Sequence, residues 1–540
     1  MRRTSTAART LPWGEAFAVL LSTAAASLIA AVWSWRHNAL LNYGDAVAHL
    51  HIARHVFDCR FHSIGEFGSV WLPLPHILML PFVQVYAWWA NGIAGLIPSA
   101  LAYLVGCVGL YRIARRWLEP AAAALALAFF ALNPNLLYLQ TTAMTEPLFL
   151  CEAIWSVAWL VEWRDALDGD PKRAARLEFL VLLALVAAVF TRYDGWMIAL
   201  LAWVGMGVTR LRNGQLGRRS FWIASAILAA APAAWLIYNA TQFGDWLDFA
   251  RGPYSAVAIE MRTAAPGWPP HPGCHNPWVS ELFFVKVAEM DTLAVWRHFA
   301  LALSVIGTAF ACAIARRRAF LWTLLLWIPV PFYAWSVAYG SVPIFIPVWW
   351  PHSFYNTRYG MELLPAIALG LGFQAQFAIG AVREFKPAWV RAAAATVAAL
   401  IVFNSALLIH KGPLVYVEST KNLEARRPFD ENIPPVLRQL LSRRPGAPVL
   451  MNSSVYPEVI AFSGIPLAQT INESDQYIYR NALAAPAGRA AIVLAFDGDE
   501  IDRAVKAHPE GLIAVARFTA RGQAAGTIYV SGTWRADRTG

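Results

Sequence analysis

Ionisable side chains near the ends of apolar segments are the residues of this sequence best suited to chemistry. They are Asp45, Glu66, Glu146, Arg192, Asp194, Arg251, Lys286 and Arg358. Ionisable residues at a membrane are costly and tend to mark function. Carboxylates can take a proton from a hydroxyl or an amine, and basic groups can stabilise a departing anion. The set predicts a site that opens to the outside and partly to lipid.

Asp45 follows Gly44 and opens a stretch of helical pattern that runs to Asp58. As a helix N-cap, Asp45 would stabilise the helix by about 1 kcal/mol. Alternatively, its carboxylate acts as a general base on an acceptor. His49 lies one turn later on the same face and can hydrogen-bond that carboxylate. The spacing alone supports both interpretations equally.

Glu146 stands between Thr145 and Pro147, where an apolar segment starts. Thr145 and Glu146 either cap that helix, with the proline in its first turn, or Glu146 supplies a second carboxylate to an external cavity. The turn from Arg192 to Asp194 is open to two interpretations as well, because a local ion pair explains it as well as a site does.

Arg358 and Tyr359 follow a loop rich in Trp and Pro and precede another apolar segment. An arginine at the membrane edge either snorkels to the interface or captures a lipid-linked phosphate through two parallel hydrogen bonds. Both tasks suit this position.

No cofactor is expected, and a divalent metal is conceivable but not favoured. His51 and His55 have i,i+4 spacing, and His271 and His275 flank Cys274, but no Cys pair or His-Glu-x-x-His accompanies them. Cys59 and Cys274 are both placed outside, so a disulfide between them is left open. Gly-rich phosphate loops are absent, which argues against a cytosolic nucleotide as energy source.

The composition indicates a polytopic helical membrane protein. The 540 residues are 58% hydrophobic and 14% charged, with five Cys, whereas a soluble domain has roughly 25% charged residues. This excludes a cytosolic enzyme, a disordered chain and a disulfide scaffold. The net charge of +10 comes mostly from short basic clusters between apolar segments, so nucleic-acid binding is not expected.

The apolar segments predict about 11 membrane spans, because about 20 apolar residues cross a bilayer as a helix. They lie near 14–34, 73–111, 119–138, 147–163, 177–191, 195–209, 221–240, 298–315, 319–339, 361–382 and 389–409. The first is interpreted as an uncleaved helix. The basic clusters, which mark cytoplasmic loops, are Arg2, Arg3 and Arg9; Arg112, Arg115 and Arg116; Arg164, Lys172, Arg173 and Arg176; Arg210, Arg212, Arg218 and Arg219; Arg316 to Arg318; and Arg383, Lys386 and Arg391.

This alternation places the N-terminus in the cytoplasm and the C-terminus outside. It allows only one crossing within 73–111, so we expect a spanning helix plus a re-entrant or interfacial piece, broken near Asn91-Gly92 or at Pro98.

Three segments are expected outside the membrane. Loops 35–72 and 241–297 belong to a transmembrane domain of residues 1–410, and residues 411–540 form a small α/β domain. There, 448–452, 491–496 and 526–531 have strand patterns, whereas 434–441, 455–462 and 499–507 have helical ones.

Short motifs in this order resemble a known superfamily. They are Tyr-Gly-Asp45, Trp71-Leu-Pro-Leu-Pro-His76, Thr-Glu146-Pro-Leu, Arg192-Tyr-Asp-Gly195 and Arg358-Tyr359, followed by an outside domain. The layout over residues 14–410 resembles the GT-C superfamily of glycosyltransferases that use polyprenyl-phosphate sugars. It is most similar to bacterial relatives of protein O-mannosyltransferases and of lipid A aminoarabinose transferase.

The resemblance implies a GT-C-like fold and an inverting sugar transfer from a polyprenyl-phosphate donor to a periplasmic lipid, glycan or protein. The catalytic acid of the first external loop falls on Asp45, although this chain has Asp45-Ala46 where many members have Asp-Glu. Glu146 and His49 would assist at the acceptor. Arg358, Arg192 and Lys286 would bind the donor phosphate, and Glu66, Asp194 and Tyr359 are candidates for the substrate groove.

The resemblance further implies a multi-pass protein of a bacterial inner membrane, in contact with membrane lipid and with its C-terminal domain in the periplasm. A membrane transporter or lipid flippase is the alternative function. Its ionisable residues would be expected near mid-membrane, where this sequence has few.

Overall fold

The computed structural model describes residues 11–60, 62–263, 269–315, 318–454 and 456–534. Arg2, Arg3 and Arg9, together with Arg316 and Arg317, lie outside the described residues. The chain forms two compact units. Unit 1 contains residues 1–37, 69–75 and 96–418, and unit 2 contains residues 38–68, 76–95 and 419–540.

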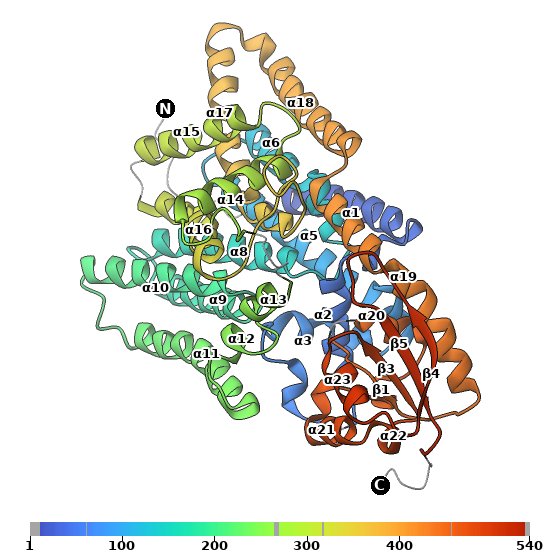
Figure 1. The fold of residues 1–540 in the computed structure, drawn as a ribbon. Helices are drawn as coiled ribbons and strands as arrows, with labels where there is room; N and C mark the ends of the chain where they lie inside the picture. The colour runs from blue at the N-terminus through green and yellow to red at the C-terminus, as the bar shows by residue number, and fades with distance from the viewer. Residues whose placement is uncertain (1–10, 61, 264–268, 316–317, 455, 535–540) are drawn as a thin grey trace. The chain divides into compact units, whose positions relative to one another are not determined.

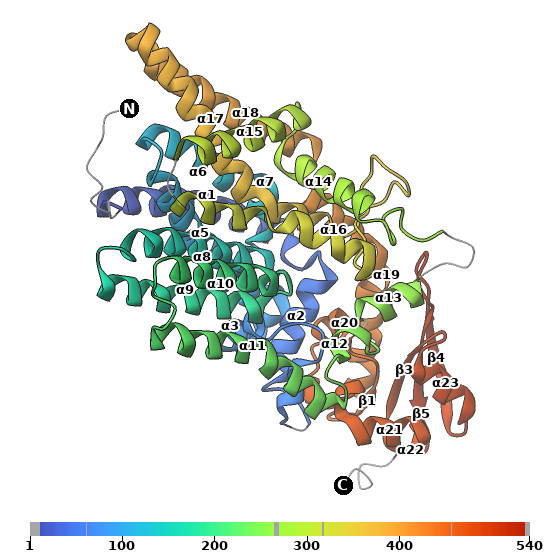
Figure 2. The ribbon, with the colours of Figure 1, turned by 90° about the vertical axis from the view of Figure 1, so that its left-hand side faces the viewer.

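Unit 1 is built from helices (Figure 1). They are α1 (Trp13–Arg36), α5 (Ile93–Arg115), α6 (Pro120–Ala131), α7 (Pro134–Leu139), α8 (Glu146–Ala166), α9 (Pro171–Thr191), α10 (Asp194–Arg212), α11 (Arg219–Phe243), α12 (Asp248–Arg251), α13 (Ala256–Thr263), α14 (Pro277–Thr292), α15 (Arg297–Ala315), α16 (Pro329–Tyr339), α17 (Leu364–Phe385) and α18 (Val390–Lys411). The 3-10 helices η3 (Arg318–Trp327), η4 (Thr357–Leu363) and η5 (Pro387–Trp389) connect some of them. Helices α8, α9 and α10 lie side by side (Figure 2).

Seven helical segments of the described chain are long and apolar enough to cross a membrane, or eight if the bent pair α14 and α15 forms one span. The larger predicted number of about 11 also included α6, α8 and α10. Helix α6 has only 12 residues, and α8 carries Glu152, Glu162 and Arg164 within its length. The chain is thus a multi-pass membrane protein with several apolar spans.

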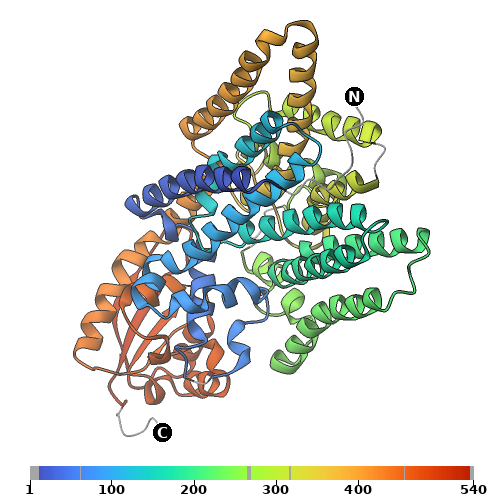
Figure 3. The same cartoon turned by 180° about the vertical axis from the view of Figure 1, so that it is seen from behind.

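Helix α1 presents a largely uncovered apolar surface. Only 17% of its most apolar window is buried, and Phe17, Leu28 and Ile29 are exposed. In Figure 3, this dark blue helix lies on the side that faces the viewer. Because apolar side chains are stable in contact with lipid tails but not with water, this surface is expected to face lipid.

The segment 73–111 is broken at Gly92, as predicted, but not at Pro98. Helix α3 (Leu74–Val83) and helix α4 (Tyr86–Asn91) are short, and Gly92 ends α4 with a φ of +89°. Pro98 lies inside the continuous helix α5. Its sixth position explains this, because a proline near a helix start removes few intrahelical hydrogen bonds.

Unit 2 contains a five-stranded sheet with the order β2-β1-β3-β5-β4. The strands are β1 (Val449–Leu450), β2 (Thr470–Ile471), β3 (Ile492–Phe496), β4 (Leu512–Phe518) and β5 (Gly526–Ser531). Strands β1, β2 and β3 are parallel, whereas β5 runs antiparallel to β3 and β4. The three predicted strands are β1, β3 and β5; β2 was missed because two residues give no pattern, and β4 because its faces do not alternate.

Helices complete unit 2. They are η1 (Ala39–Leu41), α2 (Gly44–His55), η2 (Ile64–Phe67), α3, α4, α19 (Leu414–Ser442), α20 (Pro457–Ser463), η6 (Leu467–Gln469), η7 (Glu473–Asp475), α21 (Gln476–Ala484), α22 (Pro486–Arg489) and α23 (Glu500–Ala507). The predicted helix 434–441 is the end of the much longer α19. Val455, the predicted first residue of the second helix, lies outside the described residues.

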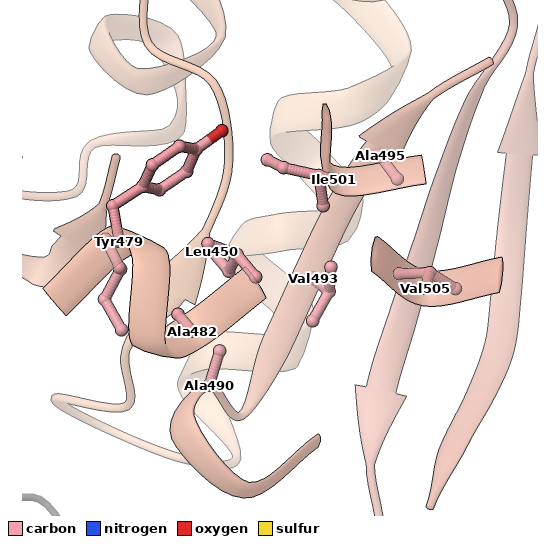
Figure 4. Close-up of a cluster of buried hydrophobic side chains, with 9 residues drawn as sticks. Leu450, Tyr479, Ala482, Ala490, Val493, Ala495, Ile501 and Val505 are labelled. Carbon is pink, nitrogen blue, oxygen red and sulfur yellow. The ribbon is translucent and has the colours of Figure 1, made fainter. Parts of the chain in front are cut away.

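The core of the sheet lies between β1, β3 and the helices that pack on them (Figure 4). Leu450 and Val493 are fully buried, and Ile501 of α23 packs against the same cluster. The predicted division of the chain at residue 410 remains a prediction about domains. In the structure, the C-terminal residues share a compact unit with residues 38–68 and 76–95, which carry Asp45.

Candidate active site

The predicted site residues fall into two groups. Glu146, Arg192, Asp194, Lys286, Arg358 and Tyr359 belong to unit 1, and Asp45, His49 and Glu66 belong to unit 2.

A buried polar cluster around Arg192 brings together five parts of unit 1. Its Nη1 donates to Thr145 Oγ1 at 2.9 Å and to Glu146 Oε1 at 3.2 Å. Its Nη2 donates to Tyr333 Oη at 2.7 Å and lies 2.9 Å from Glu362 Oε1. All three guanidinium nitrogens of Arg192 are therefore engaged once Asp194 is included.

The local pair of Arg192 and Asp194 exists, but it is one edge of this cluster. Arg192 Nε donates to Asp194 Oδ2 at 3.2 Å. Asp194 is the first residue of α10 and is 2% exposed. A carboxylate in the first turn is stabilised by the positive end of the helix dipole. The same argument applies to Glu146 at the start of α8.

Arg358 joins the cluster from η4. Its Nε donates to Glu146 Oε1 at 3.0 Å, and its Nη1 lies 3.5 Å from Glu418 Oε1. Tyr359 stacks on Tyr333 with a centroid distance of 4.9 Å and lies beneath both Arg192 and Arg358. Arg358 is therefore buried among carboxylates and does not snorkel.

Two guanidinium groups thus meet four carboxylates, those of Glu146, Asp194, Glu362 and Glu418. Glu146 and Glu362 are at most 2% exposed. Among the residues that the structure describes, Glu146 Oε2 and Glu362 Oε2 have no hydrogen-bond partner. Buried polar atoms are normally satisfied, so these two oxygens are suited to accept hydrogen bonds from the hydroxyl groups of a bound molecule.

Sequence reasoning missed Tyr333, Glu362 and Glu418. Tyr333 Oη donates to Glu362 Oε1 at 2.6 Å. Glu418 accepts hydrogen bonds at 2.8 Å from the backbone N–H groups of Asn356 and Thr357, which fixes the turn before Arg358. Only Glu362 gave a sequence signal, as an ionisable residue inside the predicted apolar segment 361–382.

Lys286 has different partners. Its Nζ lies 3.3 Å from Glu289 Oε2 and 3.2 Å from His298 Nε2. Neither partner contacts Arg192 or Arg358 in any interaction described above. The grouping of Lys286 with the two arginines therefore stays a prediction.

In unit 2, Asp45 is half-buried in the first turn of α2, where the N-cap residue is Tyr43. The N-cap interpretation of Asp45 was therefore wrong, because the helix begins one residue earlier than the Gly44-Asp45 pattern suggested. His49 on the same helix is buried, and its Nδ1 lies 2.9 Å from Nε2 of His76.

The remaining histidines of α2 line a buried polar patch. His55 forms an ion pair with Glu66, and the rings of His51 and His55 stack with centroids 5.8 Å apart. Burial, and then the proximity of His55, lower the pKa of His51 to about 3. Glu66 is therefore already paired with His55.

The cysteines and histidines of the external loops are engaged separately. Burial, and then Glu66, raise the pKa of the Cys59 thiol to about 11, and its Sγ lies 3.2 Å from His62 Nδ1. Cys59 and Cys274 are both free thiols. His271 Nε2 contacts the carbonyl oxygen of Ile344 at 2.9 Å. Within the described ranges, no three His, Cys, Asp or Glu side chains are grouped to hold a metal ion.

Comparison with known proteins places this architecture. No family model and no curated protein matches the sequence. Among solved structures, the chain is similar to ArnT from Cupriavidus metallidurans bound to undecaprenyl phosphate, with a TM-score of 0.53 and 14% identity over 96% of this chain and 99% of that one. The apo state of that ArnT gives a TM-score of 0.48, with 14% identity over 89% and 93% of the two chains.

The oligosaccharyltransferase of Archaeoglobus fulgidus, in complex with Zn and sulfate, gives a TM-score of 0.47 with 11% identity, over 94% of this chain and 72% of that one. At these identities the likeness concerns the fold. ArnT is a lipid A aminoarabinose transferase with the GT-C fold, and its likeness extends over nearly the full length of both chains. The chain therefore has a GT-C-like fold, as the sequence motifs predicted.

Proposed function

We propose that this protein is an integral membrane glycosyltransferase that moves a sugar from a polyprenyl-phosphate donor to an acceptor outside the cytoplasm. The observation that carries the proposal is the full-length likeness to ArnT bound to undecaprenyl phosphate. The buried cluster around Arg192 supports it, because open carboxylate oxygens suit the hydroxyl groups of a sugar.

In the proposed reaction, Asp45 takes a proton from the acceptor hydroxyl or amine while the acceptor attacks the anomeric carbon. The bond from that carbon to the phosphate oxygen breaks, and polyprenyl phosphate leaves with the electron pair. Attack opposite the leaving group inverts the anomeric centre. Phosphate is already a good leaving group, so the reaction needs a base and positive charge rather than a strong acid.

The other predicted residues take supporting roles in this proposal. Glu146 and His49 assist at the acceptor, and Glu66, Asp194 and Tyr359 are candidates for the substrate groove. Arg358 and Lys286 stabilise the departing phosphate. Arg192 can join them only by releasing a partner, because each of its guanidinium nitrogens is engaged, so its main task is to hold Glu146 and Glu362.

The test uses purified full-length protein in detergent with radiolabelled sugars on undecaprenyl phosphate, namely mannose, glucose and aminoarabinose. We expect release of undecaprenyl phosphate by the wild type from one of these donors. Asp45→Asn should lower turnover by about 100-fold or more, since a general base contributes about 10²- to 10⁴-fold. Asp168→Asn, at a side chain 61% exposed, is the control and should keep full activity.

Two results would contradict the proposal at different points. Near-normal turnover in Asp45→Asn would remove Asp45 as the base but leave the transferase activity intact. Absence of turnover by the wild type across the donor panel would contradict the transferase itself. Uptake and lipid-scrambling assays would then test the transporter and flippase alternatives.

A further inference from the structure

The first turn of α2, which carries Asp45, is held by two side chains of α19. The backbone N–H of Gly44 donates to Asn422 Oδ1 at 2.8 Å. Arg426 Nη2 donates to the carbonyl oxygen of Leu41. Asn422 and Arg426 are four residues apart, so they lie on the same face of their helix. All of these residues belong to unit 2.

The contact at Gly44 is close. A Cβ atom at this position would lie 3.3 Å from Asn422 Oδ1 and 3.4 Å from Arg426 Nη1. The backbone immediately before Asp45 therefore rests against both side chains. The absence of a side chain at Gly44 is what permits this approach.

Arg426 is itself fixed. It is 6% exposed, and its Nε lies 3.3 Å from Asp430 Oδ2 and 3.3 Å from Glu458 Oε1. Glu458 belongs to α20, which follows β1. The guanidinium is therefore anchored to two elements and cannot leave Leu41 without uncovering buried charge.

Other bonds join residues 38–68 and 76–95 to the C-terminal segment farther from Asp45. Arg60 Nε donates to the carbonyl oxygen of Thr470 at 2.7 Å, and Tyr86 Oη donates to that of Ala461 at 3.2 Å. The backbone N–H of Ala468 donates to Asp58 Oδ1 at 3.1 Å. Loss of the two α19 contacts alone would therefore free the first turn of α2 while the rest of the segment stays attached.

We propose that Asn422 and Arg426 are positioning residues that orient Asp45 for sugar transfer by fixing the first turn of α2. This inference rests on the proposed function, in which Asp45 is the base. A base must lie within hydrogen-bond reach of the proton that it removes, and a misplacement of about 1 Å can cost about 100-fold in rate. The C-terminal segment thereby contributes to catalysis without touching the substrate.

The kinetic test compares Asn422→Leu and Arg426→Gln with the wild type, using the radiolabelled undecaprenyl-phosphate donor that the wild type turns over. We expect kcat per folded molecule to fall by about tenfold in Arg426→Gln and about threefold in Asn422→Leu. The donor KM should change by less than twofold. Asn422 is at the surface, so its variant should fold even if Arg426→Gln does not. Arg427→Gln is the matched control, because this neighbour is 63% exposed and pairs with Glu431.

A rescue variant separates positioning from a general structural role. Asn422→Asp keeps an oxygen for the Gly44 N–H, so it should retain more kcat than Asn422→Leu. It also adds a negative charge beside the turn that carries Asp45. We therefore expect the acidic limb of the kcat–pH profile to move to higher pH in this variant. An unmoved profile together with unchanged kcat in all variants would overturn the proposal.

Hydrogen exchange provides a readout that does not depend on turnover. In Asn422→Leu and Arg426→Gln, the amides of residues 41–47 should exchange faster, whereas those of β3 should be unchanged. If the wild type turns over no donor, the proposed function fails, and the exchange result shows separately whether α19 holds the turn. Equal exchange of residues 41–47 in wild type and variants would overturn the positioning role.

Discussion

Arg192 is the residue at which the buried polar network of unit 1 converges. Its partners Thr145, Glu146, Asp194, Tyr333 and Glu362 come from separate parts of the chain. A buried charge without partners costs several kcal/mol, whereas a paired and hydrogen-bonded one is tolerated. The network is therefore expected to respond strongly to the loss of a single member.

Tyr333→Phe tests this network at one atom. The Tyr333 hydroxyl accepts from Arg192 and donates to Glu362, so its removal leaves both groups with an unsatisfied position. We expect the free energy of unfolding to fall by about 1–3 kcal/mol, measured by thermal and denaturant unfolding in detergent. Tyr339→Phe, at a ring that is 47% exposed, should change it by less than about 0.5 kcal/mol. Equal stability of both variants would contradict the role of the hydroxyl.

His51 should make the stability of unit 2 depend on pH. Its pKa is about 3 in the fold because burial, and then His55, disfavour the charged ring, whereas an unfolded histidine has a pKa of about 6.5. Between these values only the unfolded state binds the proton. The stabilisation is complete above about pH 6.5 and is lost as the pH falls toward 3, by at most about 1.4 kcal/mol per pH unit.

The measurement is a series of unfolding temperatures from pH 8 to pH 5. The wild type should lose stability toward pH 5 more steeply than His51→Leu. His508→Leu, at an exposed ring, should follow the wild type. Parallel curves for the wild type and His51→Leu would show that His51 does not stay neutral in the fold.

At the scale of elements, the break between α4 and α5 depends on Gly92. This residue has a φ of +89°, and a Cβ there would lie 2.9 Å from the Cβ of Leu40 and 3.1 Å from Cδ2 of Leu41. Gly244 ends α11 with a similar φ of +80°, but a Cβ there would meet no atom within 4 Å. The pair therefore separates backbone strain from steric overlap.

We expect Gly92→Ala to lower the free energy of unfolding by about 2–4 kcal/mol, since it adds overpacking to strain. Gly244→Ala carries the strain alone and should lower it by about 1 kcal/mol. Chemical unfolding of both variants in detergent measures the difference. If Gly92→Ala is no less stable than Gly244→Ala, the contact with η1 does not constrain this break.

At the scale of the whole molecule, the order of apolar segments and basic loops leads to a predicted orientation. An alkaline phosphatase domain fused after Gly540 should be active, because the C-terminus is predicted outside. The same enzyme fused at Gly214, between α10 and α11, should be inactive there, and a fluorescent protein at that site should be bright. A control fusion at Gly244, after α11, should restore phosphatase activity. An inactive C-terminal fusion would reverse the predicted orientation.

Much of this architecture could be predicted from the sequence. The helical segments of unit 1 follow from long apolar stretches, and β1, β3 and β5 from short ones. The break at Gly92 was predicted because Asn-Gly interrupts an apolar segment. Local composition carries this information, since burial in lipid and backbone propensity act on each segment by itself.

The sequence by itself determined that this is a helical membrane protein with a C-terminal α/β region, and which ionisable residues lie at the ends of its spans. The tertiary structure decided which of them meet. Arg358 and Glu146 form a hydrogen bond across 212 positions of the chain, and Asn422 reaches Gly44 across 378. Such pairs depend on helix packing and on the satisfaction of buried charge, and neither leaves a periodic trace along the chain.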